Sequence, residues 1–140
     1  MADITLTEAQ IAVVYPGDAL ITHKVLAEAV TAGQTLCQNT SGQAAIADAN
    51  AAGLQQVRYM ALQNGGAGES IRVLQHGHVY GFDLSAQTFD DPLFQSDTAG
   101  TVADAAGTLS VPIGIVEGVL NDGVIKKVLY FAPRTREDYA

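Results

Sequence analysis

Short apolar runs, separated by Gly, Asn, Asp, Ser and Thr, follow one another along most of this chain. Their pattern predicts β-strands over residues 20–26, 34–38, 43–47, 57–63, 70–75, 77–84, 92–95, 101–103, 112–117 and 124–131. Turn signals that recur about every 8 to 12 residues are typical of a β-sandwich or barrel. No long helical period lies between the runs, which disfavours a parallel α/β sheet. We therefore expect an all-β, antiparallel sandwich or barrel.

One phrase occurs twice. LCQNTSGQAAIADANAAGLQQVRYMALQNG starts at Leu36, and LFQSDTAGTVADAAGTLSVPIGIVEG starts at Leu93. Each predicts a strand, a turn, a returning strand, a loop of small residues and a second apolar strand. The turn over residues 39–42 requires a positive φ, which Gly42 supplies. Two copies are too few for a solenoid, so we expect a pseudo-symmetric sandwich or closed barrel.

The ends of the chain differ from this middle part. Residues 1–16 contain no Gly and end at the turn signal Tyr15-Pro16-Gly17-Asp18, which predicts an N-terminal arm. A short helix capped at Thr7 and packed on the domain is the alternative. We expect residues 17–132 to form the β domain and residues 133–140 to form a C-terminal tail, which becomes charged after Pro133. Arm and tail are the candidate segments for contacts with another protein, and a solvated chain end is the alternative for the tail.

Composition narrows the possible functions. The chain has 140 residues, the usual size of one domain, and a net charge of -8 with its seven basic residues scattered. Nucleic-acid binding needs a clustered positive surface, so we expect no direct contact with DNA or RNA. The single Cys37 excludes an intramolecular disulfide and a Cys-rich zinc site, and we expect it to be buried. No leader or membrane-spanning segment is expected, so synthesis is expected in the cytoplasm.

No motif commits the chain to catalysis or to a cofactor. His76 and His78 share one face of a predicted strand but lack a third metal ligand. The glycine cluster over residues 64–70 lacks the phosphate-loop pattern. Asp90 and Asp91 are neighbours at a turn, whereas glycosidase carboxylates face each other across a substrate. A GxSxG nucleophile motif is absent. We expect no catalytic, cofactor-binding or metal-binding residue, and no enzyme.

Three stretches carry a resemblance: MADITLTEAQIAVVYP at the start, VTAGQTLCQNTSGQ, and AGTVADAAGTLSVPIGIVEG. In composition and phrasing they resemble the small decoration, or cement, proteins that coat the capsids of tailed bacteriophages. The resemblance implies a jelly-roll domain on the outer face of the major capsid protein, present as a dimer or another homo-oligomer that bridges capsomers. It implies no cofactor, and a location on the virion surface.

Three function classes remain open. The first is capsid decoration, for which the contact candidates are Ile4, Leu6, Ile11, Val13, Val14, Tyr15, Arg134 and Arg136. The second is a sandwich that binds carbohydrate or another small ligand, for which Tyr80 and Phe82 are the close aromatic pair on alternating positions. The third is a cupin-like metalloprotein that uses His76 and His78.

Overall fold

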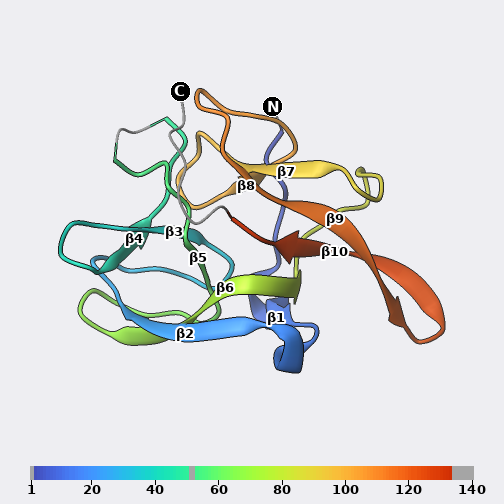
Figure 1. Ribbon diagram of the computed structural model, residues 1–140, viewed down its shortest axis with the longest axis horizontal. Coiled ribbons are helices and arrows are strands. Elements are labelled where there is room, and N and C mark those ends of the chain that lie inside the picture. Colours follow the sequence, from blue (N-terminus) through green and yellow to red (C-terminus); the bar gives the residue numbers. More distant parts are fainter. Residues whose placement is uncertain (1, 51–52, 134–140) are drawn as a thin grey trace.

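Antiparallel strands make up most of the secondary structure in the computed structural model, which describes residues 2–50 and 53–133 (Figure 1). The elements in chain order are the short 3-10 helix η1 (Glu8–Gln10), β1 (Ala12–Val13), the 3-10 helix η2 (Pro16–Asp18), β2 (Leu20–Val25), β3 (Thr35–Gln38), β4 (Ala44–Ile46), β5 (Tyr59–Ala61), β6 (Ser70–Tyr80), β7 (Pro92–Gln95), β8 (Val102–Ala103), β9 (Pro112–Asn121) and β10 (Val124–Phe131). The prediction of an all-β antiparallel fold is confirmed.

Two strands are longer than the sequence pattern predicts. Residues 70–75 and 77–84 were expected as two strands, but β6 runs unbroken through Gly77, whose φ of +152° keeps the backbone extended without a turn. β9 continues beyond residue 117 to Asn121. There a two-residue turn, Asp122-Gly123 with φ of +52° and +75°, connects it to β10. Positive φ at both turn residues matches the twist of antiparallel hairpins.

The strands form one sheet in the order β4-β3-β5-β6-β10-β9-β7-β8, and this sheet curls into a half-barrel (Figure 1). β1 and β2 also pair with β6, which is therefore the central strand. The main core cluster includes Leu74 of β6, Leu93 of β7, Ile113 of β9 and Phe131 of β10, all fully buried. Alternation of apolar and polar residues along these strands directs the apolar side chains into the curl.

The predicted repeat is confirmed, and it is more extensive than the two phrases. β3 pairs with β4 and β5 in the first unit, as β7 pairs with β8 and β9 in the second. β5 pairs with the first half of β6, as β9 pairs with β10. In the first unit, β2 pairs with the first half of β6. In the second unit, the second half of β6 takes the place of β2 and pairs with β10. The long central strand therefore belongs to both units, its first half to one and its second half to the other.

A buried polar junction joins the two units a second time. The Gln95 side chain of β7 donates hydrogen bonds from Nε2 to the carbonyl oxygens of Ala47, 3.2 Å away, and of Ser96, 3.1 Å away. The Thr35 hydroxyl of β3 donates to Gln95 Oε1. Backbone bonds support the same contact, because the N–H of Gly100 donates to the Ala47 carbonyl at 2.7 Å. Buried amide and hydroxyl groups must be paired, so this junction fixes how the units meet.

The expectation that the apolar residues of the N-terminal segment lie outside the core is wrong for Ile4. Its side chain is 6% exposed and belongs to the main core cluster, and its N–H donates to the Val102 carbonyl at 2.7 Å. β1 extends the sheet by pairing with the end of β6. Thr7 precedes η1, as the helix alternative predicted, although η1 is only a three-residue 3-10 helix. The N-terminal segment thus bonds to Ala103 and to the end of β6, and Ile11 and Val13 also pack against the main core cluster.

Cys37 on β3 is buried, as predicted. Burial raises the pKa of its thiol, because the thiolate is poorly solvated there.

No helix within residues 2–50 or 53–133 has the length and apolar character that a membrane crossing requires.

Candidate interaction surface

The β9–β10 hairpin projects from the body of the half-barrel (Figure 1). Its two strands pair continuously from Gly114 and Phe131 out to Asn121 and Val124. β10, however, pairs with β6 only at residues 129–131, and β9 pairs with β7 only as far as Ile115. Residues 118–127, which we call the distal hairpin, therefore form a two-stranded ribbon beyond the sheet. The equivalent pair in the first unit, β5 and β6, is far shorter, so the distal hairpin is an addition to the repeat.

The distal hairpin exposes large apolar side chains. Leu120 is 69% exposed, Ile125 is 64% exposed, and the two are direct cross-strand partners on one face of the ribbon. Phe89, which is 49% exposed, lies beside them above Gly118. A Cβ atom at Gly118 would lie 2.8 Å from Ile125 Cγ2 and 3.2 Å from Phe89 Cε1, so the glycine allows this close packing. We call Phe89, Leu120 and Ile125 the apolar strip.

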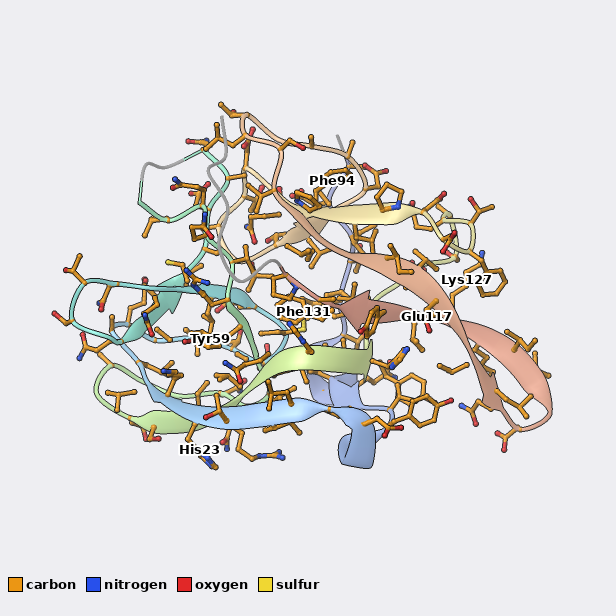
Figure 2. All side chains as sticks on the ribbon, in the orientation of Figure 1. His23, Tyr59, Phe94, Glu117, Lys127 and Phe131 are labelled. Atoms are coloured by element: carbon orange, nitrogen blue, oxygen red, sulfur yellow. The ribbon has the colours of Figure 1, made fainter. Side chains whose placement is uncertain are left out.

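Lys127 borders the apolar strip. Its Nζ lies 5.7 Å from the centre of the Phe89 ring and donates a hydrogen bond to the Gln87 carbonyl. Figure 2 shows Lys127 and Glu117 where the hairpin leaves the body. Lysine stems commonly cover apolar surface while the ammonium group stays in water. One charged residue thus borders the apolar strip, and polar groups around an apolar centre are common at protein interfaces.

Aromatic and ionic contacts hold the base of the hairpin. His78 of β6 lies 3.1 Å, Nε2 to Oε1, from Glu117 of β9. Its ring centre is 4.7 Å from that of Tyr130 on β10 and 5.4 Å from that of Tyr15 in the N-terminal segment. Four segments of the chain meet at this histidine. Together with the buried Val119 and Val128, these contacts set the direction in which the distal hairpin projects.

The hairpin is also electrically distinct from the rest of the molecule. The distal hairpin, residues 118–127, contains one acidic group, Asp122, and two basic groups, Lys126 and Lys127, which sum to +1. Since the whole chain carries -8, the rest of the chain carries -9. On an acidic protein, this apolar projection is the place where another acidic surface approaches with the least repulsion from like charge.

The contact candidates predicted from the sequence lie elsewhere. Ile4 is buried, which corrects its assignment as a free contact residue. Of the others within the described residues, Tyr15 is exposed at 41%, and the rest are half-buried against the body, namely Leu6, Ile11, Val13 and Val14. Arg134 and Arg136 lie outside the described residues. None of these candidates belongs to the apolar strip.

Sequence reasoning missed the strip, although one signal pointed to it. The segment GVLNDGVIKK contains a two-residue hairpin signal, Asp122-Gly123, with apolar neighbours on both strands. Two adjacent apolar residues on each strand, Val119-Leu120 and Val124-Ile125, place apolar side chains on both faces of a ribbon. A strand with one face on a core would carry them on one face only. Phe89 carries no comparable signal, because it is remote in sequence.

The residues considered for metal binding do not gather. His76 is exposed, while His78 is paired with Glu117. Within the part of the chain that the structure describes, no group of three or more His, Cys, Asp or Glu side chains is arranged to hold a metal ion.

Asp90 and Asp91 hold a loop in place. The N–H of Thr88 donates to Asp91 Oδ2 at 2.8 Å, and this bond lowers the pKa of the Asp91 carboxyl. The N–H of Asp90 donates to the Val116 carbonyl at 2.7 Å, which ties the loop to β9. These bonds hold the loop that carries Phe89 beside the hairpin.

The glycine cluster is likewise bonded within itself. The N–H of Gly66, which a phosphate group would need, donates to Glu69 Oε1 at 2.5 Å. A carboxylate therefore already occupies the place of an anion in this loop.

A shallow groove of about 620 Å³ lies on the other side of the hairpin. Tyr80, Gln10, Asn121 and Lys126 contribute to its lining. Phe82 packs against the main core cluster instead. The Tyr80 and Phe82 pair is therefore not an exposed aromatic platform, and Tyr80 alone faces the groove.

Comparison of this chain with protein-family models, with curated proteins and with solved structures finds no match.

Proposed function

We propose that this chain is a structural virion protein that binds the outer surface of a bacteriophage capsid and stabilises it by bridging major capsid protein subunits. The observation that carries the proposal is the apolar strip, with Leu120 and Ile125 each more than 60% exposed on a projecting hairpin. Contiguous exposed apolar surface rimmed by polar groups marks sites of protein interaction. The resemblance of three stretches to capsid decoration proteins supplies the class of partner.

The strip has the form of an interface anchor. Large side chains that insert into a pocket at the centre of an interface supply most of its binding energy. A bridging protein needs at least two such anchors, and a homodimer or other homo-oligomer of this chain presents one from each copy. We propose no enzymatic activity and no cofactor for it, and its place is the outer capsid surface.

Stabilisation follows from linkage. A protein that binds the assembled shell but not the dissociated subunits stabilises the shell by RT ln(1 + [L]/Kd), about 2.7 kcal/mol per site at a hundredfold excess over Kd. Repetition of the site over the shell multiplies the effect. The decorated shell therefore resists heat better than the bare one.

The test measures binding of the purified protein to bare shells of the particle encoded beside its gene, by co-sedimentation. Full burial of a Leu or Ile side chain contributes about 2 kcal/mol. Scaled by the exposed fractions of 69% and 64%, the double variant Leu120→Ser/Ile125→Thr should lose about 3 kcal/mol, roughly a hundredfold in Kd.

The matched control is Leu20→Ser/Val25→Thr on β2, which changes side chains that are 53% and 43% exposed. The control variant should bind shells as tightly as the unmodified protein does. Both double variants should have the same thermal stability as the unmodified protein. The proposal is wrong if the unmodified protein does not sediment with shells. Equal binding by the Leu120→Ser/Ile125→Thr variant would show that the strip is not the anchor.

Binding of a carbohydrate or another small ligand is the second candidate, and the groove beside Tyr80 favours it. An aromatic ring with the amide groups of Gln10 and Asn121 nearby provides the stacking and hydrogen bonding that sugars use. A glycan array tests this function. Binding that is lost in a Tyr80→Ala variant and retained in Leu120→Ser/Ile125→Thr would support it over capsid decoration.

A further inference from the structure

The outer edge of β10 is unpaired along the distal hairpin. The N–H of Val14 bonds to the His78 carbonyl, so His78 directs its backbone groups toward β1, and Gly77 and Val79 direct theirs toward β10. Their partners on β10 are Phe131 and Leu129. Because backbone direction alternates along a strand, Ile125 and Lys127 present their N–H and C=O groups on the same edge. Within residues 2–50 and 53–133, no segment pairs with this edge at residues 124–128.

The repeat shows what kind of segment fits such an edge. In the first unit, all six residues of β2, Leu20–Val25, pair antiparallel with β6. In the second unit the equivalent ladder contains only residues 77–79 of β6. After residue 79, the end of β6 diverges from β10 near Gly81. Gly81 has a φ of +111°, and an added Cβ atom there would lie 2.5 Å from Ile11 Cδ1, so the position requires glycine. An extended antiparallel segment would complete the second unit as β2 completes the first.

Charge favours an acidic segment over a second copy of this chain. Lys126 and Lys127 are consecutive, so they lie on opposite faces of the ribbon. Two copies paired along this edge would place four ammonium groups in one short ladder, and like charges on paired strands are destabilising. Lysine on an open edge is a known protection against self-pairing. The Lys127 ammonium already bonds to the Gln87 carbonyl, so acidic side chains on the incoming segment would pair with the exposed Lys126.

β2 also has an open edge, but it is less suitable. β2 pairs with β6 on one side only, but its register shifts between Leu20 and Ile21. Such a bulge increases the local twist and interrupts the regular alternation of donors and acceptors. The β10 edge has no register shift over its length and continues an established ladder.

We infer that the open edge of β10 receives an extended segment of the capsid partner, antiparallel to β10, with acidic side chains on the face of Lys126 and apolar side chains on the face of Ile125. The inference rests on the proposed function for the identity of the partner and adds its mode of binding. Strand addition of this kind takes affinity from main-chain bonds and specificity from alternate side chains.

The experiment uses the full chain labelled with ¹⁵N and two synthetic ten-residue peptides. One alternates valine with glutamate, and the other alternates valine with lysine. The acidic peptide should shift the amide signals of Ile125 and Lys127 and slow their hydrogen exchange, and it should bind at least tenfold more tightly than the basic one. Equal binding of the two peptides, no binding of either, or shifts confined to β2 would overturn the inference.

Two pairs of variants separate the backbone edge from the side chains. Ile125→Pro removes an N–H that faces the open edge, whereas Ile125→Thr keeps it; edge strands tolerate proline at such positions. Ile125→Pro should bind the acidic peptide at least tenfold more weakly than Ile125→Thr. The control pair, Leu120→Pro and Leu120→Thr, lies on the opposite edge of the ribbon and should bind the peptide equally.

If Ile125→Pro bound like Ile125→Thr, backbone pairing would be excluded. If Ile125→Pro failed to fold, the peptide selectivity and exchange data of the unmodified protein would still decide. Shifts of Ile125 and Lys127 that grow with protein concentration alone would identify a second copy as the occupant and overturn the inference. Because shells are not used here, shell binding without peptide binding contradicts only this inference. Peptide binding without shell binding contradicts the proposed function, and with it the identity of the partner, but not the mode of binding.

Discussion

Removal of the Ile4 side chain tests whether the N-terminal segment is part of the β core. The side chain is 6% exposed and packs in the main cluster, so Ile4→Ala removes nearly its full burial energy. At about 0.8 kcal/mol per buried carbon, the loss is about 2.4 kcal/mol before the cavity is counted. With the cavity, we expect the free energy of unfolding to fall by about 3 kcal/mol, within the range for such substitutions.

Urea unfolding followed by circular dichroism measures this change. The backbone bond from Ile4 N–H to the Val102 carbonyl survives in the alanine variant, so the loss reports the side chain alone. Leu120→Ala is the control, because its side chain is 69% exposed and its truncation should change stability by no more than about 0.5 kcal/mol. If Ile4→Ala were as stable as the unmodified protein within that margin, the Ile4 side chain would not contribute to the core, and the prediction of an N-terminal arm would hold.

Three further predictions concern the rest of the domain. Gln95→Leu should lower the free energy of unfolding by about 2 kcal/mol in urea, because the Ala47 carbonyl and the Thr35 hydroxyl lose a buried partner. Gly114→Ala should destabilise by about 3 kcal/mol or prevent folding, since the new Cβ would lie 2.0 Å from the Tyr130 carbonyl oxygen; soluble yield and thermal midpoint report the effect. The lowered pKa of Asp91 stabilises the fold above the unfolded pKa of about 3.9, and this contribution is lost as pH falls through the folded pKa. The stability difference between the unmodified protein and Asp91→Asn should therefore shrink between about pH 5 and pH 2, and an unchanged difference would exclude this linkage.

The parts of the fold that local patterns control were predictable from the sequence. β7 and β10 have the predicted bounds, since alternation and flanking turn residues define a strand within a few positions. The turn at Gly42 and the matching turn at Gly100 both have positive φ, at +79° and +72°. These signals need no knowledge of distant residues, and the same holds for the repeat.

The parts that depend on distant partners were not predictable. Nothing in the sequence near Ile4 shows that the N-terminal segment pairs with Val102 and Ala103, about a hundred residues later in the chain. Gly118 suggested the end of a strand, but its missing side chain makes room for Phe89, which comes from another loop. The candidate site lies where these distant contacts meet, so the sequence located the contact residues at the chain ends and missed the hairpin.

The preformed geometry of the hairpin bears on its proposed role. A two-stranded ribbon alone is marginally stable in water, but this one continues two strands of the sheet, buries Val119 and Val128, and is held at its base by His78 and Glu117. A partner that binds it therefore pays little ordering entropy, and more of the contact energy appears as affinity. Leu120 and Ile125 lie outside both core clusters, so they expose apolar surface that the fold itself does not use. The proposed interaction with another chain would account for both features.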